Sequence, residues 1–265
     1  MSRAPRQRRV RSAAAQAAAG AGLGLTVVLL WPAFDSPPRE MPLGAPAASV
    51  LAVPRPERLG QERHVSVWST VRRAVRARSA PERAAPVVAS VGTRTPEGTD
   101  NTLLILDRAA DRHGRVWVRA RLPVLPAGTT GWLPREAIGG YRPVRTQLVV
   151  DLRRLRATLL RDGHRILRAP VAVGQPRWPT PRGRFYIRNK LVRYRSSFYG
   201  PLAFGTSARS NVLTDWPGGG FVGIHGTDRP EQIPGRISHG CIRMRNPDIV
   251  RLGRLMPVGT PLTIR

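Results

Sequence analysis

The chain of 265 residues is strongly basic: 44 lysines and arginines face 16 acidic residues, giving a formal net charge of +28 at pH 7. Its single cysteine excludes an internal disulfide framework. The positive charge is spread along the chain without a stripe of interleaved aromatic residues, so we expect attraction to polyanions in general and no nucleic-acid partner.

The first 31 residues have the pattern of an export segment. Five arginines within residues 3–11 precede an uncharged, largely apolar stretch that ends near Trp31. About 20 apolar residues span a bilayer, and a positive flank keeps its own end in the cytoplasm. Because the nearest small-residue cleavage motif, at 45–47, lies far downstream, we expect residues 1–31 to be a basic tail and an uncleaved signal anchor, with a cleaved signal peptide as the alternative. The remainder of the chain is then expected outside the cytoplasm, in the cell envelope.

Two further segments lie between the export segment and the domain that contains the single cysteine. Residues 32–64 are rich in proline, alanine, glycine and arginine, which predicts a linker. In residues 65–143, short β-type runs alternate with turn residues, which predicts a small all-β barrel. We expect Trp117 and Trp132 to pack within this barrel rather than stack on a ligand. The segment resembles a bacterial SH3-like domain through Val75-Arg76-Ala77-Arg78-Ser79, Gly114-Arg115-Val116-Trp117-Val118 and Gly131-Trp132-Leu133.

Residues 146–265 form a second predicted domain, again rich in β-structure. The apolar runs at 148–152 and 157–160 predict two paired strands, and Asp162-Gly163 predicts the hairpin turn that follows them. Residues 192–220 are rich in glycine, serine and aromatic residues, so we expect irregular loops that shape a cleft.

One short helix is expected near the C-terminus. Asn246, Pro247 and Asp248 have the order of an N-cap, a first-turn proline and a first-turn acid. The helix is predicted over residues 249–256.

The only cysteine, Cys241, lies in the run Ser238-His239-Gly240-Cys241-Ile242-Arg243-Met244. A second His-Gly pair begins sixteen residues upstream, at His225. A thiol with a histidine partner is the arrangement of a cysteine nucleophile, because the imidazole can accept the thiol proton. The sequence therefore predicts a catalytic cysteine, although spacing alone does not bring the two side chains together.

Strand alternation indicates which side chains share a face. If residues 241–244 are extended, Cys241 and Arg243 lie on one face, while Ile242 and Met244 point to the core. In the same way, residues 221–225 place His225 opposite the apolar side chains of its strand. Gly240 allows the backbone to approach a substrate closely, so the amides of Gly240 and Cys241 are candidates for an oxyanion hole.

These motifs resemble the catalytic domain of YkuD-type L,D-transpeptidases, over residues 146–265. The resemblance rests on the Ser-His-Gly-Cys run above together with Ile224-His225-Gly226-Thr227, Asn246, Thr180-Pro181-x-Gly183-x-Phe185, Phe198-Tyr199-Gly200-Pro201 and Gly259-Thr260-Pro261. It implies a β-rich catalytic fold. With the segments described above, the chain is expected to be mainly β: an N-terminal membrane segment, a small SH3-like barrel, and a β-rich catalytic domain with a short helix.

The resemblance also implies a role for each residue of the site. Cys241 is the expected nucleophile and His225 the general base, oriented by a backbone carbonyl at Gly226. His239 and Gly240 are expected to shape the site and its oxyanion hole. The expected substrate-binding residues are Arg243, Ser238, Tyr199 and Thr227.

The implied activity is cross-linking of peptidoglycan. Cys241 attacks the carbonyl that joins the third residue of a stem peptide to a terminal D-alanine, and D-alanine leaves. An amine of a second stem peptide then resolves the thioester, which links two third residues. The resemblance implies no metal and no organic cofactor, and it implies that carbapenems are covalent inhibitors.

Two other functions are compatible with the same residues. One is an exported cysteine peptidase or carboxypeptidase that hydrolyses peptidoglycan; the other is a non-catalytic protein that binds the cell wall. Wall peptidases of the cysteine class usually place the nucleophile before the histidine, whereas here His225 precedes Cys241. This order favours the transpeptidase, and the acyl acceptor stays open.

Overall fold

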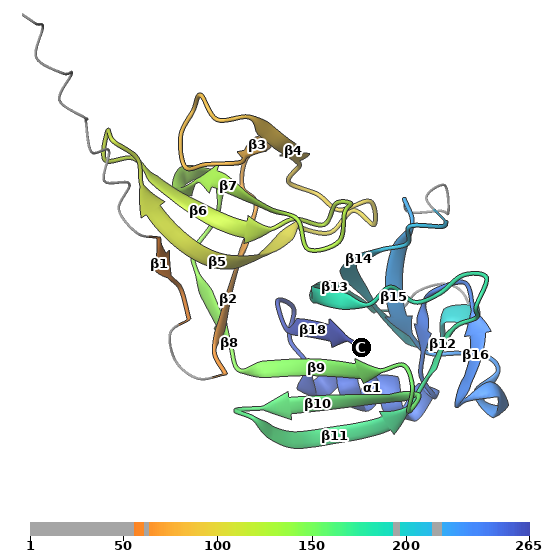
Figure 1. Ribbon diagram of the computed structural model, residues 1–265. Helices are drawn as coiled ribbons and strands as arrows, with labels where there is room; N and C mark the ends of the chain where they lie inside the picture. Colours follow the sequence, from red (N-terminus) through yellow and green to blue (C-terminus); the bar gives the residue numbers. More distant parts are fainter. Residues whose placement is uncertain (1–55, 61–63, 193–196, 214–218) are drawn as a thin grey trace, which may run out of the picture. The chain divides into compact units, whose positions relative to one another are not determined.

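The computed structural model describes residues 56–60, 64–192, 197–213 and 219–265 (Figure 1). Over these residues the chain forms two β-sheets and one α-helix. The expected export segment and most of the expected linker lie outside the described residues. Within the described ranges, no helix is long and apolar enough to cross a membrane.

The first sheet contains eight strands, and its pairs are antiparallel. The spatial order is β4-β3-β7-β6-β5-β2-β8, and β1 pairs with β5. The short β1 lies inside the segment expected to be linker. The strands are β1 (Glu57–Arg58), β2 (Ser66–Thr70), β3 (Val75–Arg78), β4 (Val87–Val91), β5 (Thr102–Ala110), β6 (Val116–Arg121), β7 (Thr130–Pro134) and β8 (Arg142–Val144).

The two tryptophans of this sheet are part of its packing. Trp117 is 1% exposed and Trp132 is 6% exposed, and both cluster with Ala109. The indole Nε1 of Trp117 donates to Oδ2 of Asp111 at 3.0 Å, which satisfies the polar edge of the buried ring. The packing role predicted for both rings is confirmed.

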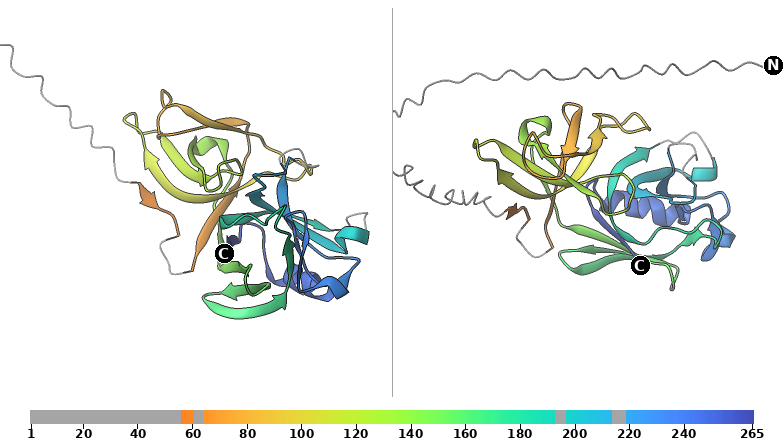
Figure 2. Two further views of the ribbon diagram at one scale, coloured as in Figure 1. Left: turned by 45° about the vertical axis from the view of Figure 1, so that its right-hand side comes forward. Right: turned by 45° about the horizontal axis from the view of Figure 1, so that its top comes forward.

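The second sheet contains ten strands in the order β11-β10-β9-β18-β13-β14-β15-β17-β12-β16, and Figure 2 shows it from two further sides. Its core is a single large apolar cluster that extends from Leu148 to Ile264 in sequence. The strands are β9 (Thr146–Asp151), β10 (Arg156–Arg161), β11 (His164–Pro170), β12 (Ala172–Gly174), β13 (Gly183–Val192), β14 (Leu202–Arg209), β15 (Phe221–His225), β16 (Gly235–Ser238), β17 (Ile242–Arg243) and β18 (Pro261–Ile264).

The first three strands of this sheet follow the sequence prediction. β9 and β10 pair antiparallel, and β10 and β11 form a hairpin in which Arg161 faces His164. The two residues of its turn, Asp162 and Gly163, have φ values of 51° and 82°. Left-handed backbone at both positions is typical of the tight turns that match the twist of a hairpin.

Residues 202–209 differ from the expectation of irregular loops, because they form β14 in the interior of the sheet. β14 pairs with β13 on one side and β15 on the other, and its first seven residues are buried. A strand that is covered on both faces needs no alternation of polar and apolar residues. The absence of that pattern is why the sequence did not reveal this strand.

The helix α1 spans Asn246–Leu255 and begins three residues earlier than predicted. Its N-cap is Arg245 rather than Asn246, and the Asn246 side chain accepts a hydrogen bond from the Thr227 N–H instead of capping the helix. Ile249 and Leu252 are fully buried against the second sheet. Lys190 of β13 donates to the carbonyl of Gly253 at 2.6 Å, which holds the helix at this sheet (Figure 1).

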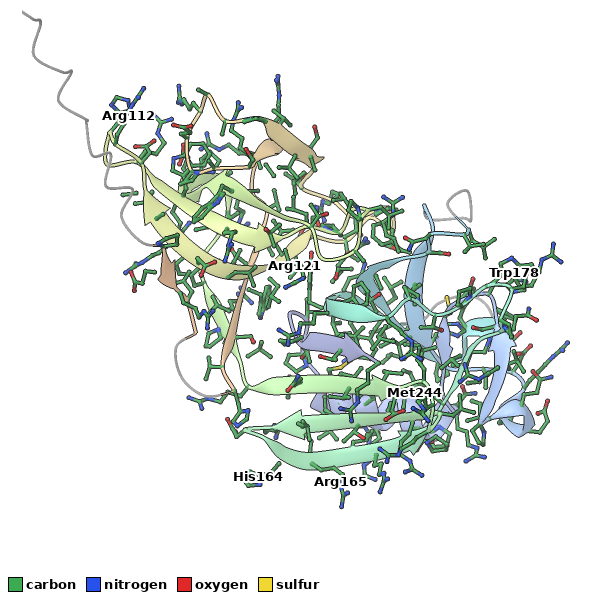
Figure 3. The ribbon with its side chains drawn as sticks, viewed as in Figure 1. Arg112, Arg121, His164, Arg165, Trp178 and Met244 are labelled. Carbon is green, nitrogen blue, oxygen red and sulfur yellow. The ribbon has the colours of Figure 1, made fainter. Side chains whose placement is uncertain are left out.

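The two sheets belong to one compact unit that begins at Leu51. Arg121 of β6 donates to the carbonyl of Arg184 in β13 at 3.3 Å, and Figure 3 labels Arg121 on the first sheet. A stronger contact joins Glu97, between β4 and β5, to the guanidinium of Arg188 at 2.8 Å. Since the Arg188 side chain is only 2% exposed, this is a largely desolvated ion pair.

Two adjacent leucines of β10 provide a test of the described core. Leu159 is fully buried in the second sheet's cluster, whereas Leu160 points to the other face and is partly exposed. We expect Leu159→Ala to lower the free energy of unfolding by about 2–5 kcal/mol, because it leaves a cavity. Leu160→Ala is the matched control and should cost clearly less. Denaturant unfolding measures both, and equal losses would contradict this placement of the strand.

Candidate active site

The pairing of two short strands brings the predicted nucleophile and base together. β17 runs parallel to β15, with Ile242 opposite Ile224 and Arg243 opposite His225. Cys241 immediately precedes β17, so this register places it beside Gly223. Ile224 and Ile242 are fully buried in the core, as strand alternation predicted. The cysteine and the histidine therefore lie on the opposite face of the sheet.

Gly223 lies between the two reactive side chains. Its N–H donates to Sγ of Cys241 at 3.4 Å. A Cβ at this position would lie 3.9 Å from Sγ and 3.9 Å from Cδ2 of His225, so thiol and imidazole flank the same glycine. The missing side chain leaves the space above Gly223 open to a substrate. Sequence reasoning did not select Gly223, although alternation puts it on the face of His225.

His225 is 2% exposed, and Nδ1 lies 2.6 Å from the carbonyl oxygen of Gly226. This is the backbone contact expected from the sequence. Because a carbonyl only accepts, Nδ1 carries the proton and Nε2 is left as the basic nitrogen. The pKa of His225 is lowered to about 4, mainly because the ring is buried. The contact with Gly226 raises this pKa, and the charge of the nearby Arg243 lowers it. The imidazole is therefore neutral at pH 7.

The thiol of Cys241 has the complementary perturbation. Burial raises the pKa of Cys241, while the Gly223 N–H and the charge of Arg243 lower it to a smaller extent. A raised thiol pKa beside a depressed imidazole pKa favours the neutral pair over a thiolate–imidazolium pair. In this resting state, deprotonation of the thiol must accompany its attack.

The turn before Cys241 is held by side-chain hydroxyls. Ser238 Oγ donates to the carbonyl of Cys241 at 2.5 Å and accepts from the N–H of Gly240 at 3.1 Å. Thr180 Oγ1 donates to the carbonyl of Gly240 at 2.8 Å. Gly240 has a φ of 112°, which side chains rarely adopt, so a glycine is required here. Since its N–H already donates to Ser238, Gly240 shapes the loop in this structure, and the Cys241 N–H is the remaining candidate oxyanion donor.

His239 forms one wall of the site. Its ring lies 4.0 Å from that of Trp178, centroid to centroid, at an interplanar angle of 34°. Trp178 is on the loop between β12 and β13, as Figure 3 shows. Tyr199 covers His225 from another side, with ring centroids 4.8 Å apart in an edge-on arrangement. Aromatic rings thus enclose the imidazole and its surroundings.

Arg243 is a buried cation that is open to a ligand. Its side chain is 7% exposed, and the guanidinium lies over the ring of Phe198 at 4.5 Å. Within the described part of the chain, Nε of Arg243 is buried and has no hydrogen-bond partner. Burial lowers the pKa of Arg243. Because the largely desolvated guanidinium lines a pocket, it can attract an anionic group of a substrate.

Six of the nine residues predicted for the site line one pocket, which we call the Arg243 pocket. They are Tyr199, His225, Ser238, His239, Cys241 and Arg243. The pocket is also lined by residues that the sequence did not single out, namely Ser210, Leu213, Gly220, Phe221 and Val222. Most of these surround the β14–β15 connection, whose sequence carries no recognisable catalytic pattern.

Thr227 and Asn246 form a support behind the pocket. Thr227 is 1% exposed, and its Oγ1 accepts a hydrogen bond from the Arg229 N–H at 3.1 Å. Thr227 was expected to bind substrate, but it does not line the Arg243 pocket. Asn246 Oδ1 accepts the Thr227 N–H at 2.9 Å. A Cβ on either Gly200 or Gly226 would collide with Asn246 Oδ1, so both glycines are required for this packing. Asn246 therefore positions the segment that orients His225.

The second sheet and its site lie in a part of the chain that is similar to known proteins. Residues 145–264 match the family described as the L,D-transpeptidase catalytic domain. A relative in Bacillus subtilis strain 168, named putative L,D-transpeptidase YkuD, is 37% identical over 95 residues, which is 36% of this chain and 51% of that protein. A second, named putative L,D-transpeptidase YqjB, is 34% identical over 102 residues and is covered to 56%.

The chain spans about half the length of the curated relatives it matches. Among solved structures, the catalytic domain of an Enterococcus faecium L,D-transpeptidase is 28% identical; the match covers 45% of this chain and 96% of that one, with a TM-score of 0.34. The family match and the motifs around Cys241 thus fall in the same part of the chain, residues 145–264.

Proposed function

We propose that this protein is a peptidoglycan L,D-transpeptidase, which passes an acyl group between stem peptides through a thioester on Cys241. The observation that carries the proposal is the grouping of Cys241 and His225 around Gly223, in a pocket that Arg243 also lines. A nucleophile, a neutral base and an anion-binding cation are the groups that an acyl donor ending in D-alanine requires.

The first half-reaction forms the acyl-enzyme. The terminal carboxylate of the donor peptide binds at Arg243, which brings the preceding carbonyl to the thiol. As Sγ attacks that carbonyl carbon, Nε2 of His225 takes the thiol proton, and the Cys241 N–H stabilises the developing oxyanion. The carbon–nitrogen bond then breaks, and His225 returns its proton to the amine of the departing D-alanine.

The second half-reaction transfers the acyl group. An amine of a second stem peptide attacks the thioester carbon, a new amide bond forms, and the carbon–sulfur bond breaks. The proton released by the amine passes through His225 to the thiolate. Water in place of the amine would make the protein a carboxypeptidase, which is the second candidate function.

Several other features belong to the same proposal. We propose that residues 65–143 are an SH3-like domain and that residues 1–31 anchor the protein in the membrane, with the catalytic domain in the cell envelope. The substrate of the proposed reaction lies outside the cytoplasm, which agrees with export. Acylation of Cys241 by carbapenems follows from the proposed thioester chemistry.

Release of D-alanine from a stem tetrapeptide tests the function directly. We expect the wild-type protein to release D-alanine and to form a cross-linked dimer, and Cys241→Ala to abolish both, because no other thiol is present. Intact mass after incubation with a carbapenem should show one adduct that the variant lacks. Retained activity in Cys241→Ala would exclude the mechanism, and hydrolysed tripeptide in place of dimer would identify a carboxypeptidase.

The protonation state of the pair is tested by alkylation. The pKa of Cys241 is raised and that of His225 is depressed, so we expect the rate of reaction with iodoacetamide to rise from pH 7 to pH 9. Above the pKa of free cysteine, about 8.5, the rate for free cysteine levels off, whereas the rate for Cys241 should still increase. The single cysteine makes the readout unambiguous. A rate that is already constant between pH 5 and 7 would show a preformed thiolate–imidazolium pair instead.

The role of Arg243 is tested by removing its charge. Arg243→Gln should raise the KM for the tetrapeptide donor by about tenfold, since a hydrogen bond between charged groups contributes about 1.5–3 kcal/mol. Arg254→Gln, on the exposed surface of α1, is the matched control and should leave the KM unchanged. The same KM in both variants would remove Arg243 from donor binding.

A further inference from the structure

Cys241 also lines a second pocket, which we call the Glu97 pocket. The two pockets share Tyr199, Phe221, Val222, His225 and Cys241. The two pockets differ in charge. Apart from histidines, the charged side chain among the described lining residues is Arg243 in the first pocket and Glu97 in the second. The nucleophile and base therefore lie between a cationic and an anionic compartment.

Glu97 comes from the other sheet, on the connection between β4 and β5. This connection is closed by the pairing of Arg94 with Asp100, and it is docked on β13 through Asn189. Asn189 Nδ2 lies 2.9 Å from Thr99 Oγ1 and 3.1 Å from Glu97 Oε2. Its Oδ1 accepts the N–H of Gly205 in β14 at 2.9 Å. Glu97 is thus held in a fixed position at the catalytic sheet.

One oxygen of the carboxylate is engaged and the other is available. Both Arg188 Nη2 and Asn189 Nδ2 donate to Oε2, at 2.8 and 3.1 Å, whereas Oε1 has no hydrogen-bond partner among the described residues. The side chain of Glu97 is 23% exposed and that of Arg188 only 2%, so the carboxylate is the part of the ion pair that faces the pocket. Arg188 itself stacks on Phe221, with Cζ 3.8 Å from the ring centroid.

We propose that Glu97 is a specificity-determining residue that binds the acyl acceptor, a protonated side-chain amine, in the Glu97 pocket. This inference rests on the proposed function. The donor carboxylate occupies the Arg243 pocket, and the acceptor reaches the thioester from the opposite compartment. Oε1 of Glu97 accepts hydrogen bonds from the amine nitrogen. The ammonium first loses one proton to solvent, and the free amine then attacks the thioester carbon. Oε1 stabilises the positive charge that the nitrogen regains in this attack, before its second proton passes through His225 to the departing thiolate, which favours aminolysis over hydrolysis.

The test compares acceptors of different charge in Glu97→Gln. Glutamine keeps an oxygen for Arg188 and Asn189 but removes the negative charge. The acyl-enzyme is formed from a stem tetrapeptide, D-alanine release is measured, and the thioester is resolved either by a stem peptide with a free side-chain amine or by an alkoxyamine, which is neutral at pH 7. Glu136→Gln, exposed in the short 3-10 helix that follows β7, is the matched control.

We expect Glu97→Gln to lower kcat/KM for the charged amine by roughly fivefold, in line with a partly exposed ion pair, and to raise the share of hydrolysed tripeptide. D-alanine release and transfer to the alkoxyamine should stay at the level of Glu136→Gln. The assignment would be overturned if Glu97→Gln changed transfer to the two acceptors by the same factor. It would also be overturned if D-alanine release and transfer to both acceptors fell by the same factor. Absence of D-alanine release by the wild-type protein would overturn the proposed function, and the role of Glu97 with it.

Discussion

The parallel pairing of β15 with β17 is the constraint on which the whole site depends. It aligns His225 with Arg243 and places Cys241 beside Gly223, so three chemically distinct groups meet on one face of the sheet. The opposite face of the same strands is occupied by Ile224 and Ile242, which are fully buried. A shift of one residue in this register would turn the thiol into the core and expose an isoleucine. The hydrophobic core thus specifies the catalytic geometry.

Burial of the site has an electrostatic consequence for the chemistry. The same desolvation that lowers the pKa of His225 raises that of Cys241, and Arg243 opposes a charge on the imidazole while favouring one on the thiol. Preformed charges are therefore disfavoured until a substrate is present. A bound carboxylate would neutralise Arg243, and the proton can then move as the thiol attacks.

Local patterns allowed much of this to be predicted, and the limits are equally local. Asp162-Gly163 specified its hairpin, and alternation around Cys241 specified which side chains face the core, because both depend on neighbours in the sequence. β14 was not predicted, since a strand buried on both faces shows no alternation. Asn246 has the residue type of an N-cap, yet its side chain binds the Thr227 backbone, a contact between distant segments that local propensity does not contain.

Glu97 shows most clearly what a sequence pattern leaves out. Nothing around it resembles a catalytic motif, and it reaches the site only because two sheets pack through the ion pair with Arg188. A buried guanidinium left without a hydrogen-bond acceptor would be costly, so Arg188 depends on the β4–β5 connection for its acidic partner within the described residues. The same dependence fixes the carboxylate at the edge of the Glu97 pocket. The contact that stabilises the packing of the two sheets therefore also supplies charge to the pocket beside Cys241. On the proposed role of Glu97, a substitution in the β4–β5 connection would alter acceptor choice without changing a residue of the second sheet.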